Sequence, residues 1–178
     1  MISSDPIVPG AAALAEAKAY LRANTAGEDA LIGRLLGTAL ELCEQFTGQV
    51  LLARGFAETL PVGLAWTRLG RRPVRAITVA DALIDGSAAA LPAGAYLTDI
   101  DAAGCGWVRV LDAGGARTIR IGFAAGLVAS WDELPEALAQ GVLRLTGHLH
   151  GNRSGTGDGA PPAAVAALWR PYRYLRLV

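Results

Sequence analysis

The sequence predicts an α+β protein, in which a small α-helical bundle carries an inserted antiparallel β lobe and a flexible C-terminal tail. Three observations predict this class. Apolar residues between Glu28 and Gly48 recur at the three-then-four spacing of one helix face. From about residue 50 to 125, short strand-like runs alternate with turns that contain Gly or Pro. Helical spacing returns at Pro135 and is followed by a glycine-rich stretch and an aromatic, basic ending.

Length and charge limit the classes of function. The chain has 178 residues, of which 52% are hydrophobic, enough for one domain with an inserted lobe. Its 16 basic and 16 acidic residues balance, which disfavours broad nucleic-acid binding. The balance is uneven: residues 1–48 have 3 basic and 6 acidic residues (net −3), and residues 151–178 have 4 and 1 (net +3). In a repeating assembly such ends can meet between subunits.

The two cysteines and the N-terminus indicate where the chain is made. Cys43 lies on a helical apolar face and Cys105 in a Gly-flanked strand, so we interpret both as reduced thiols packed as small hydrophobic groups. The opening residues have neither a basic region nor an apolar core of a signal peptide, and no apolar run is long enough to span a membrane. We therefore expect synthesis in the bacterial cytoplasm.

Residues 28–47 are predicted to form the central helix. Its acidic start suits a helix N-terminus, and Gly48 suits a left-handed C-cap. A shorter helix is predicted at 11–24, after an extended lead-in with Pro6 and Pro9, so the chain opens with a helical hairpin. A third helix is predicted from Pro135 to His150. The residues expected to pack these helices together are Leu31, Leu35, Leu42, Phe46, Leu138, Val142 and Leu145.

The β lobe is predicted to be antiparallel because no helix separates its strands. Asp85-Gly86 indicates a tight hairpin between Val74–Ile84 and an arm that reaches Leu91. A second hairpin is predicted between Trp107–Leu111 and Arg117–Phe123. In its second arm Ile119, Ile121 and Phe123 alternate with polar or small residues, which predicts one buried face. Strand-like runs are also expected at 50–60 and 95–100, and the basic cluster of Arg68, Arg71, Arg72 and Arg75 is interpreted as a solvated strand edge.

Candidate catalytic groups do not form a coherent site. His148 and His150 are two residues apart on a helix end, so their rings point to different sides and serve one metal ion poorly. Ser154 and Asp158 lie near them but in a glycine-rich segment, which lacks the rigid geometry of a catalytic triad. The same segment lacks the Lys-Ser/Thr pair of a phosphate-binding loop, and we interpret it as a linker. We predict no catalytic residue, no metal site and no cofactor.

The ending after the linker carries aromatic and Arg residues, which are enriched at binding hot spots. A short helix is expected at 163–169. We predict that the tail docks on a partner through Trp169, Arg170, Tyr172, Arg173, Tyr174, Leu175 and Arg176. Two alternatives stay open. In the first, the tail folds back onto its own core. In the second, it binds single-stranded nucleic acid, which three arginines on a neutral chain favour weakly.

The pattern resembles the head–tail connector, or adaptor, proteins of long-tailed bacteriophages and gene transfer agents. The resemblance covers nearly the whole chain and is carried by Leu14–Arg22, Glu28–Leu52, Leu134–Arg153 and Ala167–Leu177. One departure is His150-Gly151, where an aromatic residue and an acid are expected. The resemblance implies a ring, usually of twelve copies, docked beneath the portal protein around the DNA exit channel. It also implies a C-terminal segment that reaches the portal.

The leading hypothesis is therefore a non-enzymatic structural adaptor in a virion or phage-like particle. Its expected partners are the portal protein, further copies of itself and the next connector, stopper or tail protein, with DNA only as passing cargo and no membrane. The alternatives are a small hydrolase that uses His148 or His150 and a free-standing protein-binding module. The predicted division is a helical hairpin at 1–48, a β lobe at 49–128, a bundle helix at 129–151, and a linker with a docking tail at 152–178.

Overall fold

The computed structural model describes residues 1–23, 25–152 and 161–174. The chain divides into two compact units. The β unit contains Met1–Pro6 and Ala53–Leu127, and the helical unit contains Ile7–Leu52 and Val128–Val178. The mixed α+β class predicted from the sequence is confirmed.

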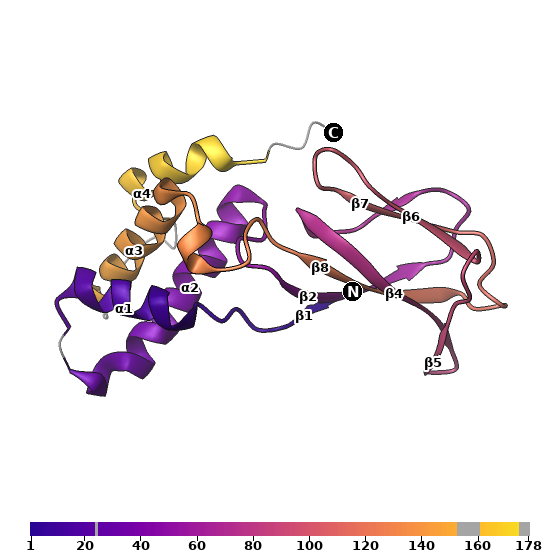
Figure 1. Cartoon of the computed structure of the whole chain (residues 1–178), viewed down its shortest axis with the longest axis horizontal. Helices are drawn as coiled ribbons and strands as arrows, with labels where there is room; N and C mark the ends of the chain where they lie inside the picture. Colours follow the sequence, from indigo (N-terminus) through magenta and orange to yellow (C-terminus); the bar gives the residue numbers. More distant parts are fainter. Residues whose placement is uncertain (24, 153–160, 175–178) are drawn as a thin grey trace. The chain divides into compact units, whose positions relative to one another are not determined.

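The helical unit has four α-helices among its described residues, namely α1 (Gly10–Leu21), α2 (Asp29–Thr47), α3 (Glu136–Gly151) and α4 (Ala163–Trp169). Three short 3-10 turns, η1 (Ala26–Glu28), η2 (Trp131–Glu133) and η3 (Arg170–Tyr172), lie between or after them. Helix α2 packs on α3, α1 packs on both, and α4 lies along α3 (Figure 1).

Helix α2 begins and ends close to the predicted positions. Its C-cap, Gly48, has a φ of 69°, and the Gly48 N–H donates to the carbonyl of Glu44. A left-handed C-cap favours glycine because a Cβ would clash with the backbone. The end of α2 could therefore be predicted from the sequence, because the left-handed position after the helix favours glycine.

The apolar stripe predicted for α2 is buried, but its most buried residues are not the ones expected to pack the core. Its fully buried apolar side chains are Ile32, Leu36, Ala39, Leu40 and Cys43. The residues predicted to pack the core, Leu31, Leu35, Leu42 and Phe46, are only half-buried at its flank. Helices α1 and α3 both contact α2, so the centre of its buried face falls between these neighbours. On α3, the predicted residues Leu138, Val142 and Leu145 are buried.

The β unit contains two sheets whose strand pairs are all antiparallel in the described residues. The larger sheet has the order β1-β2-β8-β4-β5, formed by Ile2–Ser4, Arg54–Pro61, Thr118–Ala125, Val74–Ile84 and Ser87–Ala90. The smaller sheet has the order β3-β7-β6, formed by Thr67–Arg68, Gly106–Val110 and Tyr96–Ile100. Figure 1 shows β7 and β6 side by side.

The alternation along β8 is confirmed, because Ile119, Ile121 and Phe123 are all buried. Phe123 stacks on Phe56 of β2, with ring centroids 5.5 Å apart. Val108 and Val110 of β7 are also buried and belong to the core of the β unit. This core gives the lobe an apolar interior of its own.

One predicted hairpin is confirmed and the other is wrong. Strands β4 and β5 pair across Asp85-Gly86, whose φ values are 48° and 82°. Strand β7 does not pair with β8: it pairs with β3 and β6, while β8 lies between β2 and β4. Residues 112–117 therefore connect two sheets. Strand β8 forms eight residue pairs with β2 and eight with β4. These pairings are longer than any that the five-residue strand β7 could offer, and they outweigh it.

The first residues also differ from the expected lead-in. Ile2–Ser4 form an edge strand that pairs with Phe56–Glu58 of β2. The Asp5 carboxylate then accepts a hydrogen bond from the Gly55 N–H. Residues 1–6 thus belong to the β unit and not, as predicted, to the helical hairpin at 1–48.

Candidate functional site

Trp169, the first residue of the predicted docking tail, lies inside its own chain. Its side chain is fully buried. The indole Nε1 lies 3.4 Å from the carbonyl oxygen of Leu138, and the ring lies 5.8 Å from that of Phe46. A Cβ added to Gly141 would lie only 2.1 Å from the indole nitrogen. The indole therefore occupies the space left by the glycine on α3, which corrects the prediction that Trp169 docks on a partner.

The residues after Trp169 are fixed to the C-terminal end of α2. Gln49 Nε2 donates to the Tyr172 carbonyl over 2.6 Å, and the Tyr174 N–H donates to the Thr47 carbonyl over 2.8 Å. The Arg173 guanidinium lies over the Phe46 ring, 5.7 Å from its centroid. We call residues 169–174 the C-terminal strap. The strap satisfies a terminal carbonyl group of α2, which has no partner within the helix itself.

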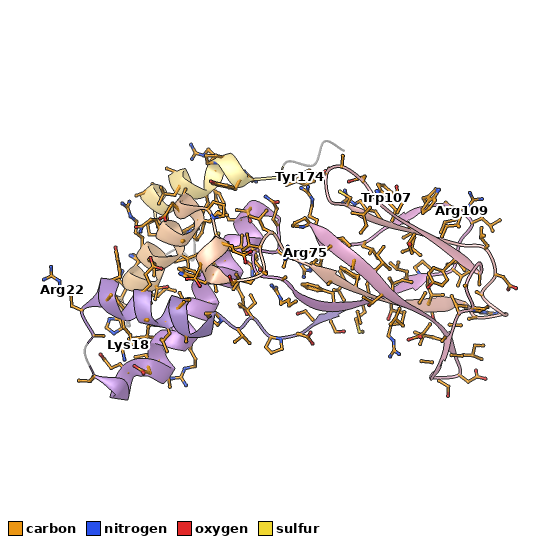
Figure 2. All side chains as sticks on the ribbon, in the orientation of Figure 1. Lys18, Arg22, Arg75, Trp107, Arg109 and Tyr174 are labelled. Atoms are coloured by element: carbon orange, nitrogen blue, oxygen red, sulfur yellow. The ribbon has the colours of Figure 1, made fainter. Side chains whose placement is uncertain are left out.

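The strap nevertheless presents polar and aromatic groups outward. Arg170, Arg173 and Tyr174 are exposed, and Tyr172 is half-buried. Figure 2 shows Tyr174 at the end of the described strap. The predicted docking residues Leu175 and Arg176, and most of the predicted linker, lie outside the described residues. The strap therefore combines an internal anchor with an exposed basic and aromatic surface.

The two histidines make short-range contacts at the end of α3. His150 Nε2 lies 3.8 Å from a Glu28 carboxylate oxygen, and the His148 ring lies 3.2 Å from the Asn152 side-chain amide. No group of three or more potential ligands that could hold a metal ion occurs within residues 1–23, 25–152 and 161–174. The contact between His150 and Glu28 joins the end of α3 to the turn before α2, and the contact between His148 and Asn152 lies at the end of α3 itself.

Both cysteines are buried free thiols. Burial, together with the nearby Glu44 carboxylate, raises the pKa of the Cys43 thiol. A thiol that stays protonated is a poor nucleophile, so Cys43 acts as a small apolar group in the core. In the part of the chain that the structure describes, no helix has both the length and the apolar character needed to cross a membrane.

Sequence reasoning missed the two residues that hold the strap. Gly141 lies within α3, where glycine is unfavourable by about 1 kcal/mol relative to alanine. A glycine within a helix, among apolar residues, indicates that another group approaches the helix closely. Gly141 could thus have indicated that a large side chain packs against α3. Gln49 carried no comparable signal, because its acceptor is a backbone carbonyl 123 positions away.

Comparison with protein-family descriptions finds no match for the chain. Comparison with curated proteins also finds no match. Solved structures do match. A chain in "Neck of empty GTA particle computed with C6 symmetry" is 29% identical, with a TM-score of 0.79. The alignment covers 100% of this chain and 97% of that one.

Two further structures give the same result. A chain in "Virion of native gene transfer agent (GTA) particle" is 29% identical with a TM-score of 0.78. A chain in "Neck of native GTA particle computed with C12 symmetry" is 27% identical with a TM-score of 0.74. Both alignments cover 100% of this chain and 97% of the other. Both units of the chain, and the order in which they are connected, are therefore similar to chains of gene transfer agent particles.

Proposed function

We propose that this chain is a structural, non-enzymatic component of the neck of a phage-like particle. The observation that carries the proposal is the likeness over the full length, at 29% identity, to a chain of a gene transfer agent neck. The alignment covers all of this chain and 97% of that chain, so the likeness includes both the helical and the β unit. The particle is thus the proposed location.

Within the neck, the chain forms a ring of twelve copies between the portal protein and the next stopper or tail protein. The similar necks were computed with C6 and with C12 symmetry. A ring of twelve satisfies both symmetries, whereas a ring of six satisfies only the first. Helices α1 to α4 form the helical bundle of each copy, the β unit is its inserted lobe, and DNA passes through the ring.

The strap defines how each copy attaches to the portal. Trp169 anchors the segment internally, and the outward groups of the strap begin the docking surface: Arg170, Tyr172, Arg173 and Tyr174. Leu175 and Arg176 continue it, followed by the remainder of the tail. Repetition around a ring makes later contacts effectively intramolecular, so weak individual contacts give strong attachment. Residues 169–174 are held against the end of α2, so this part of the docking surface is positioned before the portal binds.

The test is cryo-electron microscopy of purified particles together with a truncation series. Density for this chain between portal and tail supports the proposal, and particles that lack the chain refute it. A truncation after Tyr174 should preserve helical content and lose co-sedimentation with purified portal protein. A truncation after Ala167 is not a clean test of docking, because it also removes Trp169 from the core.

A matched pair of substitutions separates docking from folding. Tyr174→Ala removes an exposed aromatic group and leaves the backbone hydrogen bond to Thr47 in place. Ala167→Ser changes an exposed residue of α4, seven positions earlier, and should not alter portal binding. Equal co-sedimentation of Tyr174→Ala, the Tyr174 truncation and wild type would show that the tail is not the anchor.

A further inference from the structure

The outer face of the smaller sheet carries two arginines and a tryptophan. Along β7, Val108 and Val110 point into the core, while the half-buried Trp107 and Arg109 point away from it. The register places Leu97 opposite Arg109, and both Asp99 and Arg68 opposite Trp107. Residues directly opposite one another share a face. We call Arg68, Leu97, Asp99, Trp107 and Arg109 the Trp–Arg face, and Figure 2 shows Trp107 and Arg109 on the outer side of β7.

Trp107 is held in place by the loop between β6 and β7. Its indole Nε1 donates to Asp101 Oδ2 over 3.0 Å. Asp101 Oδ1 accepts the N–H groups of Ala103 at 2.9 Å and Cys105 at 2.8 Å. The indole N–H is thus satisfied and the ring is oriented before any partner arrives. An aromatic group fixed in this way loses little conformational entropy on binding.

The two arginines of the face lack partners within the described residues. Elsewhere in the β unit, Arg120 pairs with Asp81 at 2.7 Å and Arg72 donates to the Ala103 carbonyl. No hydrogen bond or ion pair joins Arg68 or Arg109 to a described residue. The Nε atom of Arg109 is also buried without an acceptor among these residues. The terminal guanidinium nitrogens of both arginines can therefore donate to carboxylate oxygens of another molecule.

The helical unit offers the complementary charge. Asp132, Glu133 and Glu136 are all exposed at η2 and the start of α3. Glu16 of α1 is exposed beside them, where its carboxylate accepts the Trp131 indole N–H over 2.7 Å. We call these four residues the acidic patch. Glu133 accepts the Ala129 N–H, but Asp132 and Glu136 form no hydrogen bond or ion pair with any described residue.

We propose that the Trp–Arg face of one copy of this chain binds the acidic patch of a neighbouring copy. The proposal rests on the ring proposed above and names the surfaces that build it. Because face and patch are different surfaces and every copy has both, the contact is heterologous, and in the twelve-copy ring proposed above it repeats from copy to copy around the ring. Trp and Arg supply the buried, directional part of the contact, and the opposite charges fix its register.

Two charge-reversed variants test this pairing. The first is Arg68→Glu with Arg109→Glu, and the second is Asp132→Lys with Glu136→Lys. Each replaces the native chain in particle-producing cells, alone or together, and copies per purified particle are counted by quantitative mass spectrometry. Either variant alone should reduce the copy number about tenfold or more, because like charges then meet at every interface. Together they should restore it, since alternating copies recreate opposite charges at each contact in an even-numbered ring.

The matched control is Arg75→Glu with Arg117→Glu, which reverses two exposed arginines of the same unit outside the face. It should leave the copy number unchanged. A wild-type copy number for the first variant, or no restoration on co-expression of two folded variants, overturns the pairing while the neck function stands. Absence of the native chain from particles overturns the neck function itself. If thermal melting shows that the first variant is unfolded, Arg68→Gln with Arg109→Gln removes the charges more gently, and an unchanged copy number again overturns the pairing.

Discussion

Replacing Gly141 with alanine should destabilise the helical unit, although alanine is the better helix former. The added Cβ would lie 2.1, 2.7 and 2.8 Å from Nε1, Cδ1 and Cε2 of Trp169. All three atoms belong to one rigid, fully buried ring, so the whole indole must move. Overpacking typically costs about 1–3 kcal/mol, and an approach of 2.1 Å to a rigid ring places this case at the upper end, above the gain of about 1 kcal/mol from helix propensity. The net loss should appear as a lower urea midpoint by far-ultraviolet circular dichroism.

A double-mutant cycle makes the reasoning refutable. Trp169→Ala alone should cost about 3–5 kcal/mol, because it removes a fully buried indole and leaves a cavity. In that background Gly141→Ala should become neutral or stabilising, since its obstacle is gone. Gly33→Ala and Gly37→Ala in α2 are the controls, because an added Cβ meets no atom within 4 Å at either position. If Gly141→Ala stabilises the wild-type chain as the controls do, the indole does not occupy this site.

Three further predictions follow from burial and hydrogen bonding. Leu36→Ala should lower the free energy of unfolding by about 2–5 kcal/mol, and Leu35→Ala by clearly less, because only Leu36 is fully buried; equal urea midpoints would contradict this. The pKa of Asp101 lies below its ordinary value, chiefly because the Trp107 indole N–H donates to the carboxylate and secondly because the Cys105 N–H does. The carboxylate therefore contributes fully to the stability of the fold at neutral pH, and this contribution is lost as the pH falls below roughly 4. The Trp107 indole resonance should therefore titrate only in that acidic range by NMR, and Asp101→Asn should abolish the titration. His148→Ala with His150→Ala should leave particle assembly and DNA delivery largely intact; loss of delivery by correctly assembled particles would favour the catalytic alternative.

Features governed by neighbouring residues were predictable from the sequence. Gly48 ends α2 for a local steric reason, and Asp85-Gly86 forms the hairpin turn because these residue types tolerate the left-handed φ values of such a turn. The alternation of Ile119, Ile121 and Phe123 likewise indicated a strand with one buried face. In each case the determining interactions lie within a few residues of one another.

The errors concern interactions between distant parts of the chain. The pattern of β7 and β8 showed two strands but not that each prefers partners in a different sheet. An aromatic residue near a terminus suits a docking tail and a core anchor equally well. The choice between them depended on Gly141, which lies 28 positions before Trp169. Likewise, the directions from which α1 and α3 approach decide which apolar residues of α2 are fully buried and which are half-buried.

The position of Trp169 also sets the order in which the chain can fold during synthesis. Every described strand of the β unit has been made once Ala125 is made, so that unit can fold while translation continues. Helices α1 and α2 are made first, yet the core that they share with α3 lacks its indole until residue 169 emerges. Until then Gly141 of α3 lacks the indole that lies against it in the folded chain. The helical unit therefore receives its largest fully buried side chain only after every described strand of the β unit has been made.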